Sequence, residues 1–198
     1  MPLQGAGPLE PAALFDPRPA EVWLEVGFGA GEHLAHQAAR HPHVGLIGAE
    51  PYVNGVARLL ARIADAGLAN VRIHPDDARP LLARLAEGSL ARVFVLFPDP
   101  WPKARHRKRR LVTPEGLDVF ARLLADGGTM HVASDHAPYL ADALAAGLAH
   151  PAFAWRAERA ADWARPADAG PLSRCEAKAA KAGRPAAYLT FVRRRRVA

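Results

Sequence analysis

The sequence predicts an α/β fold built on a mostly parallel sheet with helices on both faces. Apolar runs typical of buried strands alternate with helical periodicity from residue 22 almost to residue 149. One helical stretch repeats its apolar residues at i, i+3, i+4 and i+7, namely Val56, Leu59, Leu60 and Ile63. Because strands that alternate strictly with helices pair in parallel, this order of elements predicts the fold class.

The expected strands are short and apolar. They lie at 22–26 (VWLEV), 44–49 (VGLIGA), 71–73 (VRI), 92–97 (RVFVLF), 129–134 (TMHVAS) and 187–192 (AYLTFV), the last at or near a sheet edge. Helices are expected between them, from the first turn to residue 40 and around 56–63, 81–85, 114–125 and 139–148. Residues 156–186 show no convincing period, so we expect them to be irregular.

The composition limits the class of protein. The chain has 198 residues, enough for one domain with a real core, and its net charge of +6 suits a polyanionic partner. The single cysteine, Cys175, excludes an intramolecular disulfide and a multi-cysteine zinc site, and the histidines show no metal-ligand spacing. Residues 1–11 lack the layout of a signal peptide and no apolar run is long enough to span a membrane, so a cytoplasmic setting without membrane attachment is expected.

A glycine-rich turn follows the first strand and reads Glu25-Val26-Gly27-Phe28-Gly29-Ala30-Gly31. Its three glycines let the backbone turn sharply and approach a ligand closely, with a helix N-terminus behind the turn. The dinucleotide-binding fingerprint has its third glycine where this sequence has Glu32. The acidic Glu25 before the turn favours a ligand that carries an ammonium group, and a plain tight turn is the alternative.

Two further acidic positions follow the next two strands. Glu50 ends the second strand, where a carboxylate can accept both ribose hydroxyls of a nucleoside. Asp77-Ala78 lies just past the third strand, where an aspartate can accept the exocyclic amine of adenine, although spacing alone barely separates Asp77 from Asp76. Because the carboxyl ends of consecutive parallel strands meet at one crevice, the joint placement of these residues predicts a nucleoside site.

The most informative segment is Phe97-Pro98-Asp99-Pro100-Trp101-Pro102 with the basic run that follows it, 103–110 (KARHRKRR). Asp99 stands between two prolines that fix the backbone around it, and Trp101 offers a stacking face. A rigid carboxylate, an aromatic ring and a phosphate-binding run suit chemistry on a nucleic-acid base. A solvated loop and a nuclear-localisation signal are the alternatives.

Three other features carry less information. Residues 193–196 are four arginines in a row, which we interpret as a solvated tail. Asp135 follows the fifth strand and is expected at the same edge of the sheet. Ser173 and Glu176 lie in the irregular region, where periodicity predicts a loop and assigns them no role.

Taken together, these motifs closely resemble the tRNA (guanine-N7)-methyltransferase family. The resemblance rests on LEVGFGAGEHL, GAEPYVNGV, DDA at 76–78, LFPDPWPKARHRKRR, ASD at 133–135 and the late S-R-C-E, and it spans residues 22–193. It implies one domain over 1–198 with the Rossmann-like class I methyltransferase fold, whose sheet has seven strands with an antiparallel last strand. Within it, we expect a short N-terminal extension (1–20), an irregular insertion on the substrate side (156–186) and a basic tail (193–198).

The resemblance also assigns roles to residues. Contacts with S-adenosylmethionine fall to the acidic residues and the glycine turn, namely Glu25, Gly27, Gly29, Gly31, Glu50, Asp77, Ala78 and Asp99. This chooses Asp77 over Asp76 and makes Asp99 the catalytic residue as well. The guanosine would contact Lys103, Asp135, Ser173 and Glu176, the last two in a T-x-x-E motif that holds the base. The RNA-interaction segment would comprise Arg105, His106, Arg107, Lys108, Arg109 and Arg110.

The sequence departs from the family pattern in three places. Ser173 replaces the usual threonine and keeps its hydroxyl, whereas Cys175 replaces an aromatic residue that could stack. The first strand begins near residue 22, and many relatives carry a longer basic N-terminal arm. If such an arm is missing here, we expect weak tRNA affinity for the family.

The chemistry expected of the family needs little acid–base help. Guanine N7 has a free lone pair at neutral pH, so catalysis is chiefly in-line positioning, with Asp99 or Glu176 stabilising the cationic base and general-base catalysis ranked second. The expected partner is tRNA, modified in the variable loop by a monomer without a metal. The alternatives are a methyltransferase acting on another RNA base or a small molecule, an inactive RNA-binding homologue and, last, an NAD-dependent oxidoreductase.

Overall fold

The computed structural model describes residues 7–196, which contain one mixed sheet of seven strands. The strand order is β3-β2-β1-β4-β5-β7-β6. Neighbouring strands pair in parallel except at β7, which runs antiparallel to both β5 and β6. The predicted fold class, with its antiparallel last strand, is confirmed. Residues 1–6 of the expected N-terminal extension and 197–198 of the expected tail lie outside the described residues.

The elements follow the predicted alternation. The strands are β1 (Glu21–Val26), β2 (Val44–Ala49), β3 (Val71–His74), β4 (Leu90–Leu96), β5 (Leu124–Ser134), β6 (Phe153–Trp155) and β7 (Ala187–Arg193). The α-helices are α1 (Glu32–Arg40), α2 (Val53–Ala66), α3 (Ala78–Arg84), α4 (Pro114–Leu123), α5 (Ala137–Ala149) and α6 (Arg174–Lys181). Three short 3-10 helices are η1 (Pro11–Leu14), η2 (Ala104–Arg109) and η3 (Ala160–Trp163). All six expected strands are therefore present.

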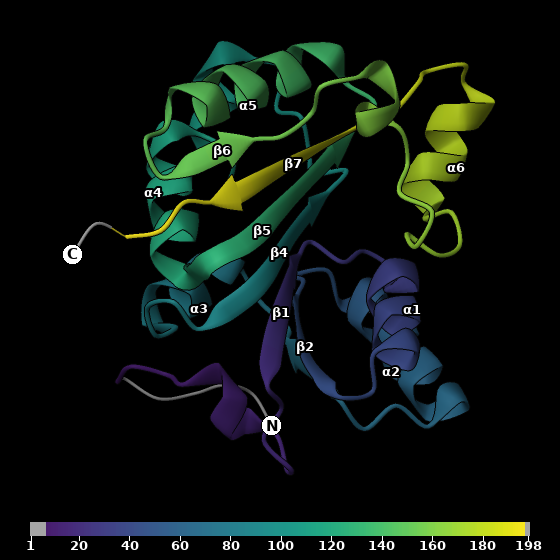
Figure 1. Ribbon diagram of the computed structural model, residues 1–198. Coiled ribbons are helices and arrows are strands. Elements are labelled where there is room, and N and C mark those ends of the chain that lie inside the picture. The colour runs from purple at the N-terminus through teal and green to yellow at the C-terminus, as the bar shows by residue number, and fades with distance from the viewer. Residues whose placement is uncertain (1–6, 197–198) are drawn as a thin grey trace.

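Different helices cover the two faces of the sheet. Figure 1 shows α1 and α2 on one face, and α3, α4 and α5 on the other. The strand order reverses at β1: β2 and β3 are added on one side of it, and β4 and β5 on the other. The crevice beyond the carboxyl ends of these strands is where sheets of this topology bind ligands.

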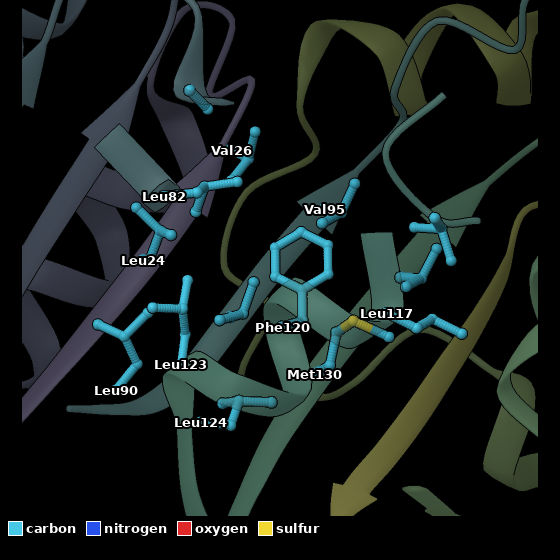
Figure 2. Packing of buried hydrophobic residues seen from close by; sticks show 14 of the residues in the cluster. Leu24, Val26, Leu82, Leu90, Val95, Leu117, Phe120, Leu123, Leu124 and Met130 are labelled. Carbon is cyan, nitrogen blue, oxygen red and sulfur yellow. The ribbon is translucent and has the colours of Figure 1, made fainter. Parts of the chain in front are cut away.

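Alternation along β1 divides its side chains between two cores. The larger core receives the side chains of Val22, Leu24 and Val26. Figure 2 shows part of this core, in which Phe120 of α4 lies among Val95, Leu117 and Met130. Trp23 enters the smaller core, on the side of α1 and α2. Glu25 follows Trp23 by two residues, so the pleat directs its carboxylate towards the same face.

The chain after residue 150 is more ordered than the sequence predicted. Residues 153–155 form an edge strand, β6, which leaves β7 one place inside the edge. Residues 156–186 contain η3 and the helix α6, so the loop expected at Ser173–Glu176 is the start of a helix. η3 has only four residues, and α6 (RCEAKAAK) carries alanines and charged residues instead of large apolar side chains, which is why the pattern did not reveal them.

The arginines at 193–196 correct the interpretation of a solvated tail. Arg193 Nε donates to the Ala121 carbonyl at 2.8 Å, and Arg194 Nε donates to the Phe153 carbonyl at 2.8 Å. The guanidinium of Arg196 reaches the carbonyls at the C-terminus of α4, those of Ala121, Arg122 and Leu124. The last carbonyls of a helix have no partner within it, so Arg193 and Arg196 complete the end of α4.

Candidate active site

The glycine-rich turn between β1 and α1 has room for a ligand. Gly27, Gly29 and Gly31 have φ values of 76°, 58° and 75°, in the left-handed region that favours glycine. A Cβ atom on Gly27 or Gly29 would meet nothing within 4 Å, whereas one on Gly31 would lie 2.7 Å from the Leu59 side chain. The first two glycines therefore leave open space above the turn, and the third allows α2 to pack closely.

Glu50 fixes the shape of this turn. Its side chain is buried, and Oε2 accepts a hydrogen bond of 2.9 Å from the Gly29 amide. Oε1 accepts another of 2.9 Å from the amide of Tyr52. An ionised carboxylate has about four lone-pair sites, so two remain for hydroxyl donors. Glu50 thus lies where the sequence predicted it, beside the glycine turn, with acceptor capacity left.

Glu25 lies under the turn in a buried polar chain that the sequence did not indicate. His33 Nδ1 lies 2.8 Å from Glu25 Oε2. Gln37, one helical turn later, lies 3.3 Å from His33 Nε2 and donates to the Asp168 carbonyl at 2.9 Å. Burial alone would lower the pKa of His33, but the carboxylates of Glu25, Glu176 and Asp168 together outweigh it and raise the pKa above its usual value. The i, i+4 spacing of His33 and Gln37 was the signal that could have revealed this chain.

Asp77 lies at the N-terminus of α3, whose first residue is the buried Ala78. Asp77 Oδ1 accepts from the Arg79 amide at 2.9 Å, and Oδ2 pairs with Arg79 Nη1 at 2.7 Å. Asp76 Oδ1 accepts from the Asp77 amide at 2.7 Å. Asp77 therefore caps the helix, and Asp76 supports it from outside the cap.

A cavity joins the glycine turn to the insertion that carries α6. From the turn and α1 it is lined by Glu25, Gly27, Gly29 and His33. From the insertion it is lined by Asp168, Ser173, Cys175 and Glu176. Figure 1 shows α6 at the same side of the sheet as α1, above the end of β1. Two groups of predicted site residues that are far apart in the sequence therefore face one space.

Glu176 is the most heavily hydrogen-bonded carboxylate of this cavity. It is 9% exposed, and its Oε1 accepts from Arg165 Nε at 2.8 Å and from the Tyr188 hydroxyl. Its Oε2 accepts from the Ser173 amide at 2.9 Å, while Ser173 Oγ accepts from the Glu176 amide at 3.2 Å, which makes a capping box. Burial alone would raise the pKa of Glu176, but the hydrogen bonds from Tyr188, Ser173 and Arg165 lower it. Neither Arg165 nor Tyr188 stood out in the sequence.

The loop that carries Asp99 is strained at two positions. Phe97 and Trp101 have φ values of 50° and 41°, which cost non-glycine residues about 1–3 kcal/mol each. The Asp99 side chain between them is exposed. The guanidinium of Arg109 lies 4.7 Å over the Trp101 ring, and His106 meets the ring at 5.7 Å. Trp101 is therefore packed within its own loop and the basic segment.

Arg110 corrects the predicted RNA-interaction segment. It is 8% exposed, with Nε donating to the Pro100 carbonyl at 2.8 Å and Nη1 pairing with Asp142 Oδ2 at 2.6 Å. Its guanidinium carbon also lies 5.3 Å from the Tyr139 ring. Buried on these partners, Arg110 cannot reach a phosphate, and it holds the Asp99 loop in place instead.

The remaining positive residues of the segment are available at the surface. Lys103, Arg105, Arg107, Lys108 and Arg109 are exposed, and His106 is half-buried. Within residues 7–196, the side chains of Arg105, Arg107 and Lys108 form no hydrogen bond or ion pair. This surface has the positive charge that phosphates require.

Asp135 follows β5 and pairs with Arg184, whose Nε lies 2.7 Å from Asp135 Oδ2.

Burial raises the pKa of the Cys175 thiol, and the carboxylates of Asp135, Glu32 and Asp99 raise it further. Neither Asp99 nor Asp135 is among the residues that line the cavity. Among residues 7–196, no three acidic, histidine or cysteine side chains are placed to hold a metal ion, and no helix there has the length and apolar character to cross a membrane.

Comparisons with known proteins agree with this geometry. A family model described as "Putative methyltransferase" matches residues 19–189. The tRNA (guanine-N(7)-)-methyltransferase of Rhodospirillum rubrum is 53% identical over 203 residues, covering 100% of this chain and 79% of that protein. Its namesake from Mesorhizobium japonicum is 47% identical, covering 97% of this chain and 82% of the relative.

Solved structures share the fold. The 16S rRNA (adenine(1408)-N(1))-methyltransferase from Catenulisporales acidiphilia matches with a TM-score of 0.63 and 16% identity, covering 98% of this chain and 97% of the other. An rRNA methylase from Streptococcus thermophilus matches with a TM-score of 0.59 and 14% identity, covering 88% and 87%. The match to the family model and the identity to the Rhodospirillum rubrum and Mesorhizobium japonicum proteins lead to one conclusion: the chain belongs to the tRNA (guanine-N(7)-)-methyltransferase family.

Proposed function

We propose that this chain transfers the methyl group of S-adenosylmethionine to N7 of a guanosine in the variable loop of tRNA. The observation that carries the proposal is the cavity shared by two groups of residues, Glu25 with the glycine turn and Ser173 with Glu176. One group suits the cofactor and the other suits a guanine base. The exposed basic segment next to the Asp99 loop supplies a surface for the RNA backbone.

The residues around the turn fit the cofactor. Glu25 can accept a hydrogen bond from the ammonium group of the methionine part, and the space above Gly27 and Gly29 allows the close approach of a ligand. The free lone pairs of Glu50 suit the ribose hydroxyls, and Asp77 at the head of α3 suits the adenine amine. When bound, the cofactor supplies a methyl group already activated on a sulfonium.

The chain's own residues then position the base and stabilise its charge. Guanine N7 needs no deprotonation, so holding it in line contributes most of the catalysis. Glu176, kept ionised by its three donors, has about one lone-pair site left, on Oε2, which can accept a hydrogen bond from the guanine N1–H or exocyclic amine. The exposed carboxylate of Asp99 can stabilise the positive charge that develops on the base. Lys103 and Asp135 would contact the guanosine from the neighbouring loops.

The RNA backbone would bind the side chains that have no partner in the protein. Arg105, Arg107 and Lys108 are the principal candidates, with His106 and Arg109 beside them on Trp101. Because the substrate is tRNA, we place the enzyme in the cytoplasm, acting as a monomer. Sedimentation of the protein with and without tRNA measures that state directly.

The test is incubation of an unmodified tRNA transcript with methyl-labelled S-adenosylmethionine, followed by mapping of the label. We expect N7-methylguanosine in the variable loop. The matched control is a transcript with 7-deazaguanosine at the mapped position, which has no N7 and should take up no label. Label on another base, or label that persists in the deaza control, would overturn the proposed reaction.

Asp99 allows a sharper test of the mechanism. If Asp99 stabilises charge, Asp99→Asn should lower the single-turnover rate by on the order of 10²-fold or more, since it removes the charge and keeps the shape. Because N7 needs no base, the wild-type rate should be nearly flat between about pH 6.5 and 8.5. A wild-type rate that rises steeply over this range, with the rise lost in Asp99→Asn, would instead make Asp99 a general base.

A further inference from the structure

We propose that Tyr188 is a positioning residue that ties Glu176 to the start of the Asp99 loop, so that the two carboxylates meet the target base together. The inference rests on the proposed function, because it assigns the base to Glu176 and Asp99. Two contacts of Tyr188 carry it, one made by the hydroxyl and one by the ring.

The hydroxyl of Tyr188 donates to Glu176 Oε1. The same oxygen accepts from Arg165 Nε at 2.8 Å, so β7 and the insertion both hold it. Arg165 also donates to the carbonyl of Gly170 at 2.7 Å, within the insertion itself. Tyr188 is thus the donor that connects the Glu176 carboxylate to the sheet.

The ring of Tyr188 meets the ring of Phe97 edge to face, with centroids 6.3 Å apart and planes at 78°. Phe97 has a φ of 50°, and it is the residue at which β4 gives way to the Asp99 loop. A non-glycine residue stays in this region only where its surroundings hold it. The Tyr188 ring is one of those surroundings, so it helps to set the direction in which the loop leaves the sheet.

Tyr188 is well anchored for this role. It lies on β7, where it is in register with Ala133 of β5, and β6 pairs with the same strand further along, at Phe191–Arg193. Its neighbour Leu189 is 1% exposed and enters the larger core, whereas Tyr188 lines the cavity from the other face of the sheet. A side chain fixed to the sheet can transmit its position to both groups that it contacts.

Loss of the hydroxyl should change the ionisation of Glu176 in a known direction. The pKa of Glu176 lies below its usual value because Tyr188, Ser173 and Arg165 donate to it. The other ionisable or charged side chains that line this cavity are Glu25, Glu32, His33, Arg92, His131, Asp168, Arg174 and Cys175. All of these remain in Tyr188→Phe, so only one donor is lost and the pKa of Glu176 should rise. Charge on Glu176 would then be lost at a higher pH as acid is added.

The experiment compares Tyr188→Phe with Tyr188→Leu in the full chain. Tyr188→Phe keeps the ring against Phe97 and should raise the KM for tRNA about tenfold or more, as expected for one bond to a charged group, with kcat little changed. Its acid limb in kcat/KM should move to higher pH. Tyr188→Leu loses the ring as well and should also lower kcat, because the Asp99 loop loses a support. Affinity for S-adenosylhomocysteine should match wild type in both.

A second measurement does not depend on activity. The carboxyl carbon of Glu176, assigned by comparison with Glu176→Gln, is titrated by NMR in wild type, Tyr188→Phe and Thr190→Val. Thr190 is on the same strand as Tyr188, and Thr190→Val removes a hydroxyl that lies 3.2 Å from Nδ1 of His131 on β5, so it should leave the titration of Glu176 unchanged. We expect a higher midpoint in Tyr188→Phe alone.

The outcomes separate this inference from the proposed function. A wild-type chain that does not methylate tRNA would reject the proposed function, while the NMR titration would still decide whether Tyr188 governs Glu176. An unchanged midpoint in Tyr188→Phe would overturn the inference. The double variant Tyr188→Phe with Glu176→Gln gives a further check. If its fold-loss in kcat/KM equals the product of the two single fold-losses, the inference is also overturned, because a residue that acts through Glu176 should add little once Glu176 is replaced.

Discussion

The two arginine-rich runs are alike in sequence and opposite in structure. At 193–196, Arg193, Arg194 and Arg196 fold back onto backbone carbonyls of the protein. In the segment 105–109, Arg105 and Arg107 are exposed and form no hydrogen bond or ion pair within the described residues. Counting charges in the sequence could not distinguish them.

The difference follows from what lies beside each run. β7 delivers residues 193–196 to the C-terminus of α4, where free carbonyls and the helix dipole attract guanidinium groups. Residues 105–109 follow a loop held by prolines and lie on a short 3-10 helix. A run of positive charge therefore indicates a binding surface only where the fold offers it no acceptors of its own.

Arg110 ends the basic run 103–110, but it is buried, unlike the exposed arginines before it. Its removal should have the largest effect on stability. Arg110→Ala leaves the carbonyls of Pro100 and Trp101 without a donor and removes a contact with Tyr139. Loss of a buried ion pair can cost about 3–5 kcal/mol, but Asp142 is half-exposed and stays solvated, so we expect about 2–3 kcal/mol. Urea unfolding measures this loss.

The same variant should lower the methylation rate, because the Asp99 loop loses its anchor. Arg107→Ala, three residues earlier, is the matched control and should leave the free energy of unfolding within about 0.5 kcal/mol of wild type. Equal stabilities of the two variants would contradict the structural role given to Arg110.

Substitutions in the exposed segment 105–109 should have the next largest effect, on tRNA binding. Arg105→Ala with Arg107→Ala should weaken tRNA binding roughly tenfold and flatten its dependence on log salt by up to about 0.7–0.9 per lost contact. The control pair Arg40→Ala with Arg58→Ala removes the same charge from exposed positions on α1 and α2. Filter binding between low and moderate salt gives both slopes. Equal slopes for the two pairs would mean that only net charge matters.

Much of the fold could be predicted because its strands are apolar and its helices are long. The expected strands at 44–49 and 187–192 agree with β2 and β7 to within one residue. β6 (FAW) and α6 (RCEAKAAK) were missed because the first has only three residues and the second has no stripe of large apolar side chains. β6 pairs with β7, and Glu176 of α6 accepts from Tyr188, so tertiary contacts rather than local sequence specify both elements.

The site could be predicted in part, and for a related reason. Residues at the carboxyl ends of parallel strands, such as Glu25 and Glu50, follow from the topology. The partners that set their geometry do not: His33 and Arg165 meet their carboxylates through the packing of α1 and of the insertion. The resemblance brought Ser173 and Glu176 to attention, whereas the capping box that orients them became evident only in the helix.

A substitution in the run 193–196 should have a small effect, and on stability alone. Arg196→Ala removes the donors to the carbonyls of Arg122 and Leu124 at the end of α4, together with exposed pairs to Glu87 and Asp126. Exposed ion pairs contribute little, so the carbonyls should account for most of a loss of about 1 kcal/mol, or roughly 2–4 °C in Tm for a chain of this size.

The adjacent arginine is the control for this prediction. Arg195 is exposed, and its side chain forms no hydrogen bond or ion pair within residues 7–196, so Arg195→Ala should leave Tm unchanged although it removes the same charge. Arg196→Ala should not alter the salt slope of tRNA binding, because the guanidinium of Arg196 is already held by the protein. A reduced slope in Arg196→Ala would mean that the C-terminal run releases these carbonyls to bind RNA, and the contrast between the two runs would then disappear when the substrate binds.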